Sequence, residues 1–308
     1  MKFKNKVLGI VAIFASILVS VQASVTVPSP LISTDWLSKN KNDVIILDVQ
    51  AKITKKMKTI DGATIVDWKN VRDKKSEDGM NLIKMVPSKD TFSKLMQSLG
   101  VNNNSAIVIT SSSNDAGSTF LGTRLYWQLK YFGHDNVALL DGGNAKWESE
   151  KRTMGESATP SKGNFVAKTE RKELLATTSD VETALRNKDT IILDGRPEEQ
   201  YLGLFYKTKY VYGAGHIPGA KLAYGDIFLT HGKIKTFQDK ATIQKIFDAK
   251  NIDTSAKSIS YCNSGHMASG LWFIEHELLG NKNIKLYDGS AHAWTKSKNR
   301  PMTTFKYE

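Results

Sequence analysis

The chain has 308 residues, one cysteine and a formal net charge of +12. A single cysteine excludes an internal disulfide, so the fold must be stabilised by its hydrophobic core, and the length suggests two domains. The lysines are scattered rather than clustered with aromatic residues on one face. This argues against nucleic-acid binding and favours a basic, solvated surface that would attract small anions.

The N-terminus has the pattern of an export signal. Three lysines among the first six residues precede an apolar stretch over 7–21, and Val21-Gln22-Ala23 fits a small-residue cleavage site. We therefore expect residues 1–23 to be a cleaved signal peptide, and the mature protein to be periplasmic or secreted with no stable membrane span. An uncleaved membrane anchor is the alternative, because the stretch is slightly long for a signal and short for a span.

Beyond this segment, short apolar runs alternate with amphipathic stretches. Strands are expected at 44–49, 106–110, 137–140, 190–193, 258–261 and 284–287. Helices are expected at 89–99, 118–131, 179–186, 240–250 and 268–279. This alternation predicts an α/β fold with two tandem domains, each a largely parallel sheet flanked by helices.

The two halves of this pattern repeat each other. Residues 45–49 (IILDV) recur as 191–195 (IILDG), and residues 140–143 (LDGG) recur as 287–290 (YDGS). Trp147 and Trp294 follow the second motif at matching places and are expected to pack in a core or an interface. We predict an N-terminal domain over 24–150, a polar linker over 151–173 and a C-terminal domain over 174–308.

Cys262 lies in the run 260–268 (SYCNSGHMA), between an expected strand and an expected helix. Backbone N–H groups of such a turn and the positive end of the helix both stabilise a thiolate. A small buried hydrophobe is the alternative role for a free cysteine. The repeat matches Cys262 with Thr110, so only one of the two loops carries a sulfur, and the first domain would cover and shape the site in the second.

Together these motifs resemble the rhodanese family of sulfurtransferases in its tandem two-domain form. The resemblance spans about residues 31–302 and is carried by LDGRP at 193–197, GHIPGA at 215–220, YCNSGH at 261–266 and LYDG at 286–289. It implies that the N-terminal domain is non-catalytic. It also implies that Cys262 takes a sulfur atom from a donor as a persulfide and passes it to cyanide or a thiol.

The resemblance further implies that no organic cofactor and no metal is needed, and the histidines and the cysteine lack tight metal-ligand spacing. We expect the partners to be a small anionic sulfur donor and a cyanide or thiol acceptor, and the protein to be a monomer. With no second cysteine, an external acceptor must remove the sulfur.

The loop around Cys262 is expected to bind the donor or the persulfide through its backbone. The amides that would form this cradle are those of Asn263, Ser264, Gly265, His266 and Met267. Gly265 would supply the positive φ of a tight turn. The side chain of His266 is expected either to assist proton transfer or bind an anion, or to face solvent.

Arg196 matches the arginine of the family's aspartate-x-arginine motif, so we expect it to bind the anionic donor, with Asp194 orienting the turn. A structural salt bridge from Arg196 to Asp194, Glu198 or Glu199 is the alternative. His216, in the GHIPGA motif, is expected to pack and hydrogen-bond within a turn rather than to take part in catalysis.

The identity of the donor stays open because the chain departs from the family pattern. Asn263 and Ser264 are neutral where some thiosulfate-using members are basic, and Gln200 stands where some members carry a further arginine. Small neutral residues before glycine are found in members that use 3-mercaptopyruvate. We favour thiosulfate, because the protein is exported and basic, with 3-mercaptopyruvate as the alternative. The missing charge could come from other lysines of the second half: Lys207, Lys209 or Lys221.

Two other functions compete with sulfur transfer. Phosphatases and arsenate reductases with a related loop keep an arginine six residues after the cysteine, where this chain has Ala268. The loop is also one residue shorter than those enzymes need, so phosphatase activity is disfavoured. A non-enzymatic persulfide carrier or binding module is compatible with Cys262.

Overall fold

The structure is a computed structural model that describes residues 25–305. The expected signal peptide over 1–23 lies outside these residues. Within the described part of the chain, no helix is both long enough and apolar enough to cross a bilayer.

The first domain is built on a five-stranded parallel sheet with the order β1-β8-β7-β2-β4. Its strands are β1 (Leu31–Ile32), β2 (Ile45–Gln50), β4 (Thr64–Asp67), β7 (Ile107–Thr110) and β8 (Val137–Leu140). Its helices are α1 (Thr34–Asn40), α2 (Lys89–Ser98), α3 (Ala116–Tyr131) and α4 (Gly143–Ser149). Two antiparallel pairs complete it: β3 (Thr59–Ile60) with β9 (Met154–Gly155), and the β5–β6 hairpin, β5 (Asp73–Glu77) and β6 (Met80–Met85).

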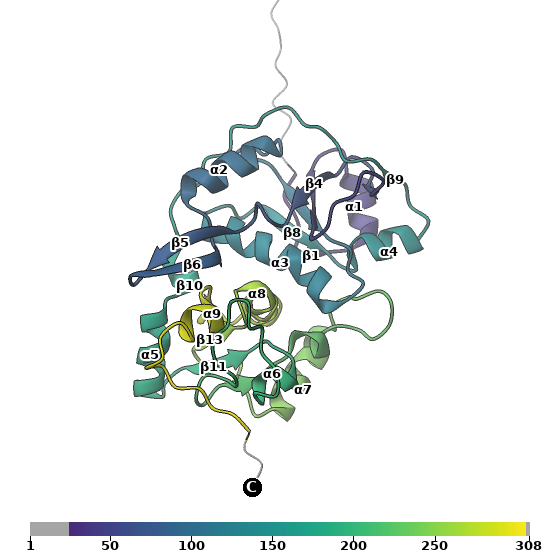
Figure 1. The fold of residues 1–308 in the computed structure, drawn as a ribbon. Helices are drawn as coiled ribbons and strands as arrows, with labels where there is room; N and C mark the ends of the chain where they lie inside the picture. Colours follow the sequence, from purple (N-terminus) through teal and green to yellow (C-terminus); the bar gives the residue numbers. More distant parts are fainter. Residues whose placement is uncertain (1–24, 306–308) are drawn as a thin grey trace, which may run out of the picture.

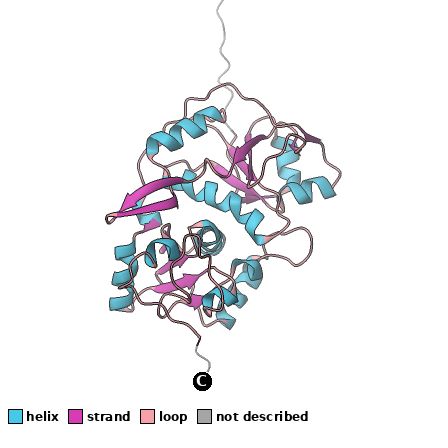
Figure 2. Ribbon diagram, in the orientation of Figure 1, coloured by secondary structure: helices cyan, strands magenta, loops and turns pink. Residues whose placement is uncertain are grey.

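The second domain repeats this topology with the order β10-β14-β13-β11-β12. Its strands are β10 (Leu175–Ala176), β11 (Ile191–Asp194), β12 (Lys221–Leu222), β13 (Ser258–Tyr261) and β14 (Ile284–Tyr287). Its α-helices are α5 (Thr178–Asn187), α6 (Glu198–Tyr201), α7 (Lys240–Ala249), α8 (His266–Phe273) and α9 (Ser290–Trp294). Shorter helical turns are η1 (Lys172–Leu174), η2 (Gly225–Phe228) and the π-helical η3 (Ile274–Leu279). The prediction of two α/β domains with parallel sheets flanked by helices is confirmed (Figure 2).

The ends of the predicted helices differ from the sequence expectations for local reasons. Helix α3 begins at Ala116, two residues early, because Asp115 and Ser118 form a capping box that satisfies the first amides. The predicted helix over 268–279 begins at His266 and passes into the π-helical turn η3 after Phe273. The central strands β8, β13 and β14 lie at the predicted residues.

Helices α3 and α8 pack against each other where the two domains meet (Figure 1). Both are buried on nearly every face, because each packs on its own sheet and on the opposite domain. A Cβ on Gly270 would lie 2.6 Å from the Phe120 ring, so this glycine permits the close approach. The hydroxyls of Thr123 and Ser269 are 2.8 Å apart in the same buried contact. The domain interface is therefore a continuation of both cores.

The segment predicted as a linker, 151–173, connects the two sheets while packing along the first domain. Phe165 is buried in the core, and its backbone N–H donates to the carbonyl of Val101. Two strand residues of β9 pair with β3. As predicted for the two repeated tryptophans, Trp147 and Trp294 are both buried.

Candidate active site

Cys262 follows the carboxyl end of β13 and begins the loop that leads into α8. Its side chain is a free thiol in a residue that is only 1 % exposed. The Ser290 hydroxyl holds this loop, because it accepts from the N–H groups of Cys262 and Gly265 at 3.1 Å and donates to the Tyr287 carbonyl at 2.8 Å. The carboxyl ends of parallel strands are where ligand sites of such sheets lie, so the position suits chemistry.

Ser290 was not singled out from the sequence, although the repeat carried a signal. It stands in the left-handed region at φ +52°, and the matching residue of the first domain is Gly143 at φ +51°. A non-glycine residue in this region costs about 1–2 kcal/mol. The replacement of glycine by serine at this turn therefore provides the hydroxyl that fixes the loop, and only in the copy that contains the cysteine.

Gly265 has φ +72° and precedes the first residue of α8, as the sequence analysis predicted for a tight turn. It provides no side-chain cap, so the first amides of the helix remain available to a ligand. One part of the predicted cradle needs correction, because the Gly265 N–H already donates to Ser290. The cradle is thus limited to the other loop amides.

An ion pair between the two domains lies against the cysteine loop. Arg124 of α3 lies 2.6 Å from the carboxylate of Asp288, and both side chains are buried. The same carboxylate accepts from the Val86 N–H at 2.6 Å. Arg124 also reaches the Gly265 carbonyl at 3.4 Å. The first domain therefore covers and shapes the site of the second, as its lack of a cysteine suggested.

Arg196 and Asp194 form a fully buried ion pair. The guanidinium donates to both oxygens of Asp194 at 2.6–3.1 Å and to the Gly215 carbonyl at 2.7 Å. The Tyr261 hydroxyl donates to the same carboxylate at 2.6 Å. These bonds keep the pKa of Arg196 above its ordinary value despite burial. The geometry is that of the structural alternative, with the turn oriented by Asp194, and donor binding by Arg196 stays a prediction.

The loop side chains next to Cys262 are held by polar neighbours. Asn263 donates to the Gln200 side chain at 2.9 Å, while its amide oxygen is buried without a partner among the described residues. Ser264 is buried and hydrogen-bonds with the Tyr210 hydroxyl. Met267 is half-buried and packs against the core, so only its amide can belong to the cradle.

His266 contacts the first domain and is only partly buried. Its Nε2–H donates to the Gly117 carbonyl at 2.9 Å, and its ring lies 4.8 Å from that of Trp68. Burial, aided by the charge of Arg72, lowers the pKa of His266 to about 3. The imidazole is therefore neutral at pH 7, which disfavours anion binding by an imidazolium.

His216 has the structural role predicted for it. Its ring stacks on Tyr201 with centroids 3.8 Å apart, and its Nδ1–H donates to the Tyr201 carbonyl at 2.8 Å. Its backbone pairs with Thr303.

Two cations of the first domain lie near the cysteine loop, Arg72 on the Trp68 ring that contacts His266 and Lys84 on the Tyr210 ring, and neither was found from the sequence. Burial and the neighbouring Arg124 lower the pKa of Arg72 to about 10, opposed by Tyr210, Asp288 and Cys262. Burial, Arg72 and Lys207 lower the pKa of Lys84 to about 8, again opposed by Cys262. Both side chains remain largely charged at pH 7. Isolated basic residues in the non-catalytic half carry no motif, so nothing in the sequence marked them.

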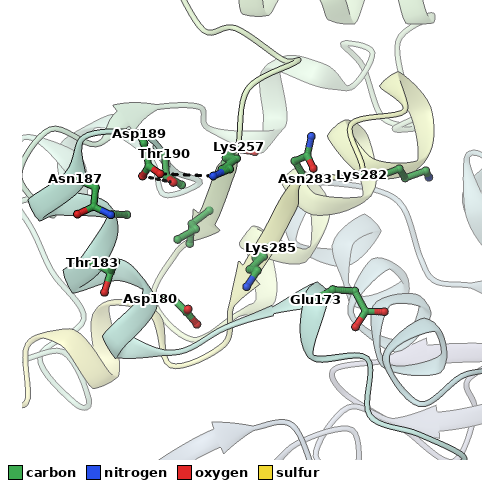
Figure 3. A pocket seen from close by; sticks show the side chains of 13 residues that line it. Glu173, Asp180, Thr183, Asn187, Asp189, Thr190, Lys257, Lys282, Asn283 and Lys285 are labelled. Atoms are coloured by element: carbon green, nitrogen blue, oxygen red, sulfur yellow. Dashed lines mark hydrogen bonds and ion pairs between the residues drawn. The ribbon is translucent and has the colours of Figure 1, made fainter.

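A separate pocket of about 360 Å³ opens at the opposite ends of the strands of the second sheet (Figure 3). Thr190, Ser258 and Asn283 place it at the amino ends of β11, β13 and β14, opposite the end that carries Cys262. Charges of both signs surround it, and Lys257 pairs with Asp189 at 3.6 Å. It is therefore distinct from the site around the cysteine.

Sequence comparison finds relatives along nearly the whole chain. A protein of Saccharopolyspora erythraea named "Putative thiosulfate sulfurtransferase" is 29 % identical over 277 residues, covering 86 % of this chain and 92 % of that protein. The "Sulfur carrier protein TtuD" of Thermus thermophilus is 29 % identical over 287 residues, covering 87 % and 94 %.

Structure comparison identifies the same fold in solved proteins. The 3-mercaptopyruvate sulfotransferase SseA of Escherichia coli superposes with a TM-score of 0.71 at 24 % identity, covering 85 % of this chain and 98 % of SseA. EanB in complex with ergothioneine gives a TM-score of 0.77 at 18 % identity, covering 91 % and 71 %.

The family assignment rests on both halves of the chain. Residues 33–150 and 177–297 each match the Rhodanese-like domain. The two matches correspond to the two repeated sheets, and the cysteine loop lies in the second. The chain belongs to the rhodanese family of sulfurtransferases and carries two copies of its domain.

Proposed function

We propose that this protein is a thiosulfate sulfurtransferase that works through a persulfide on Cys262. The Cys262 thiolate attacks the outer sulfur of thiosulfate and forms a new S–S bond. The bond between the two sulfurs of thiosulfate breaks, and sulfite leaves with the electron pair. Cyanide or a thiolate then attacks the outer sulfur of the persulfide, so thiocyanate or a new persulfide departs and the thiolate is regenerated.

The observation that carries this proposal is the position of Cys262. It lies in a loop fixed by Ser290, next to the uncapped N-terminus of α8, with Arg72 and Lys84 of the first domain nearby on the Trp68 and Tyr210 rings. Backbone amides, the helix terminus and the cations all favour anionic sulfur over neutral sulfur. These features support a thiolate before transfer and an anionic persulfide after it.

The choice of thiosulfate over 3-mercaptopyruvate is supported by proton requirements. Sulfite leaves as a stable anion and needs no proton, whereas loss of sulfur from 3-mercaptopyruvate breaks a C–S bond and requires a proton on carbon. His266 is a poor acid for this step, because with a pKa of about 3 it holds no extra proton at pH 7. The name of the Saccharopolyspora relative points to the same donor.

Two further parts of the proposal concern the setting of the reaction. We place the mature protein outside the cytoplasm, on the basis of the signal-like N-terminus. The persulfide has no second cysteine to resolve it, so an external cyanide or thiol takes the sulfur.

The test is intact-mass measurement of the mature protein after incubation with thiosulfate. We expect one added sulfur atom, lost again on addition of cyanide, and no adduct in Cys262→Ser. Parallel turnover measurements with thiosulfate and 3-mercaptopyruvate then identify the donor. An adduct that persists in Cys262→Ser, or no adduct with either donor, contradicts the proposal. A stable adduct with negligible turnover supports the carrier alternative, which the Thermus relative's name also describes.

A further inference from the structure

The arginine that the family resemblance assigns to the donor is largely engaged in this chain. The Arg196 guanidinium is buried against Asp194 with only its Nη1 left without a partner among the described residues, and Gln200 hydrogen-bonds Asn263 where a second arginine could have stood. The two loop residues after Cys262 are neutral. A dianionic donor therefore needs positive charge beyond what Arg196 offers.

Arg72 has a buried hydrogen-bond donor that is available to a ligand. Its guanidinium lies 4.3 Å above the Trp68 ring, and its Nε is buried without a hydrogen-bond partner among the residues the structure describes. A buried donor without a partner is costly, so such groups commonly face a ligand or water. The nearby carboxylate of Asp288 is already paired with Arg124.

Lys84 is held in place by strong local constraints. Its φ of +65° is in the left-handed region, which a lysine adopts only when its surroundings impose it. The neighbouring Ile83 N–H donates to His292 Nε2 at 3.1 Å, and the Val86 N–H donates to Asp288. Both acceptors belong to the second domain, so Lys84 is fixed across the domain boundary.

The lysine side chain is also directed toward the cysteine loop. Its Nζ lies 3.3 Å from the centroid of the Tyr210 ring, and the Tyr210 carbonyl accepts from His292, whose backbone N–H donates to the Asn263 carbonyl in the loop. Arg72, Lys84 and Tyr210 all interact electrostatically with Cys262. Contacts therefore connect both cations to the cysteine loop: Arg72 through Trp68 to His266, and Lys84 through Tyr210 and His292 to Asn263.

We propose that Arg72 and Lys84 of the N-terminal domain form the binding site for the dianionic sulfur donor. This inference rests on the proposed function, because it names the residues that select the donor for that reaction. The two positive charges match the two negative charges of thiosulfate and of the departing sulfite. The non-catalytic domain is then a required half of the active site.

The test compares alkylation of Cys262 by iodoacetate, an anion, with alkylation by neutral iodoacetamide. Both reagents must reach the same buried sulfur, so the ratio of their rates reports the local charge and not the access. We expect Lys84→Met and Arg72→Gln each to lower this ratio about tenfold or more, and to raise the KM for thiosulfate by a similar factor. Lys84→Arg and Arg72→Lys should retain most of the ratio.

The matched control is Lys75→Met, which removes a charge from an exposed position on β5 of the same hairpin. It should leave the ratio unchanged. An unchanged ratio in both Lys84→Met and Arg72→Gln, or an equal fall in Lys75→Met, overturns the proposal.

A second measurement needs no variant. Sulfate, an unreactive dianion, should slow iodoacetamide labelling of wild-type Cys262, and a lack of protection at high sulfate overturns the site. Neither the ratio of alkylation rates nor the protection by sulfate depends on sulfur transfer. If thiosulfate gives no adduct, the proposed function fails while the anion site is still decided by alkylation.

Discussion

Gly265→Ala tests how strongly the stability of the protein depends on the packing of the cysteine loop against the Arg124–Asp288 ion pair. A Cβ at this position would lie 2.5 Å from Arg124 Nη1 and 2.7 Å from Asp288 Oδ1, and the residue has φ +72°. The left-handed backbone costs an alanine about 1–2 kcal/mol. The new methyl group also crowds the ends of a buried ion pair, and over-packing of this kind costs about 1–3 kcal/mol.

We therefore expect Gly265→Ala to lower the free energy of unfolding by about 2–5 kcal/mol, measured by urea denaturation. The control is Gly219→Ala, since Gly219 has φ +75° and nothing within 4 Å of its would-be Cβ. That variant should lose only the backbone part, about 1–2 kcal/mol. If the two alanine variants are equally destabilised, the loop does not depend on the Arg124–Asp288 pair and the reasoning is refuted.

Two further predictions concern ionisable side chains at or near the site. Asp194→Ala leaves the Arg196 guanidinium buried without its carboxylate and should lower the free energy of unfolding by about 3–5 kcal/mol, measured with urea. The control Asp189→Ala removes a largely exposed partner of Lys257 and should cost less than about 1 kcal/mol. Similar losses in the two variants would contradict a structural role for the buried pair. His266 has a folded pKa of about 3, below its ordinary 6.5, so the folded state resists its protonation. The stability it contributes is present above pH 6.5 and is lost as the pH falls toward 3, by up to about 1.4 kcal/mol for each pH unit. His266→Gln should therefore lose less stability than the wild type between pH 6.5 and 4, and identical pH profiles would refute the assignment.

The duplication and the position of the cysteine were predictable because local patterns encode them. Apolar runs of strand length, amphipathic helices and the repeated Asp-Gly turns lie within short windows of sequence. The strands at 258–261 and 284–287 and the loop that begins at Cys262 lie at the predicted residues. The positive φ of Gly265 also followed from its place in a tight turn before a helix.

The charge arrangement around Cys262 was decided only by the tertiary structure. Arg72, Lys84 and Arg124 come from the first domain, more than 130 residues before the cysteine, and no motif marks them. The sequence assigned donor binding to Arg196, which the fold pairs with Asp194. The sequence by itself determined where the cysteine sulfur lies, because a strand, a turn and a helix are local. Only the packing of one domain on the other determined which cations face that sulfur, because the contacts join distant segments.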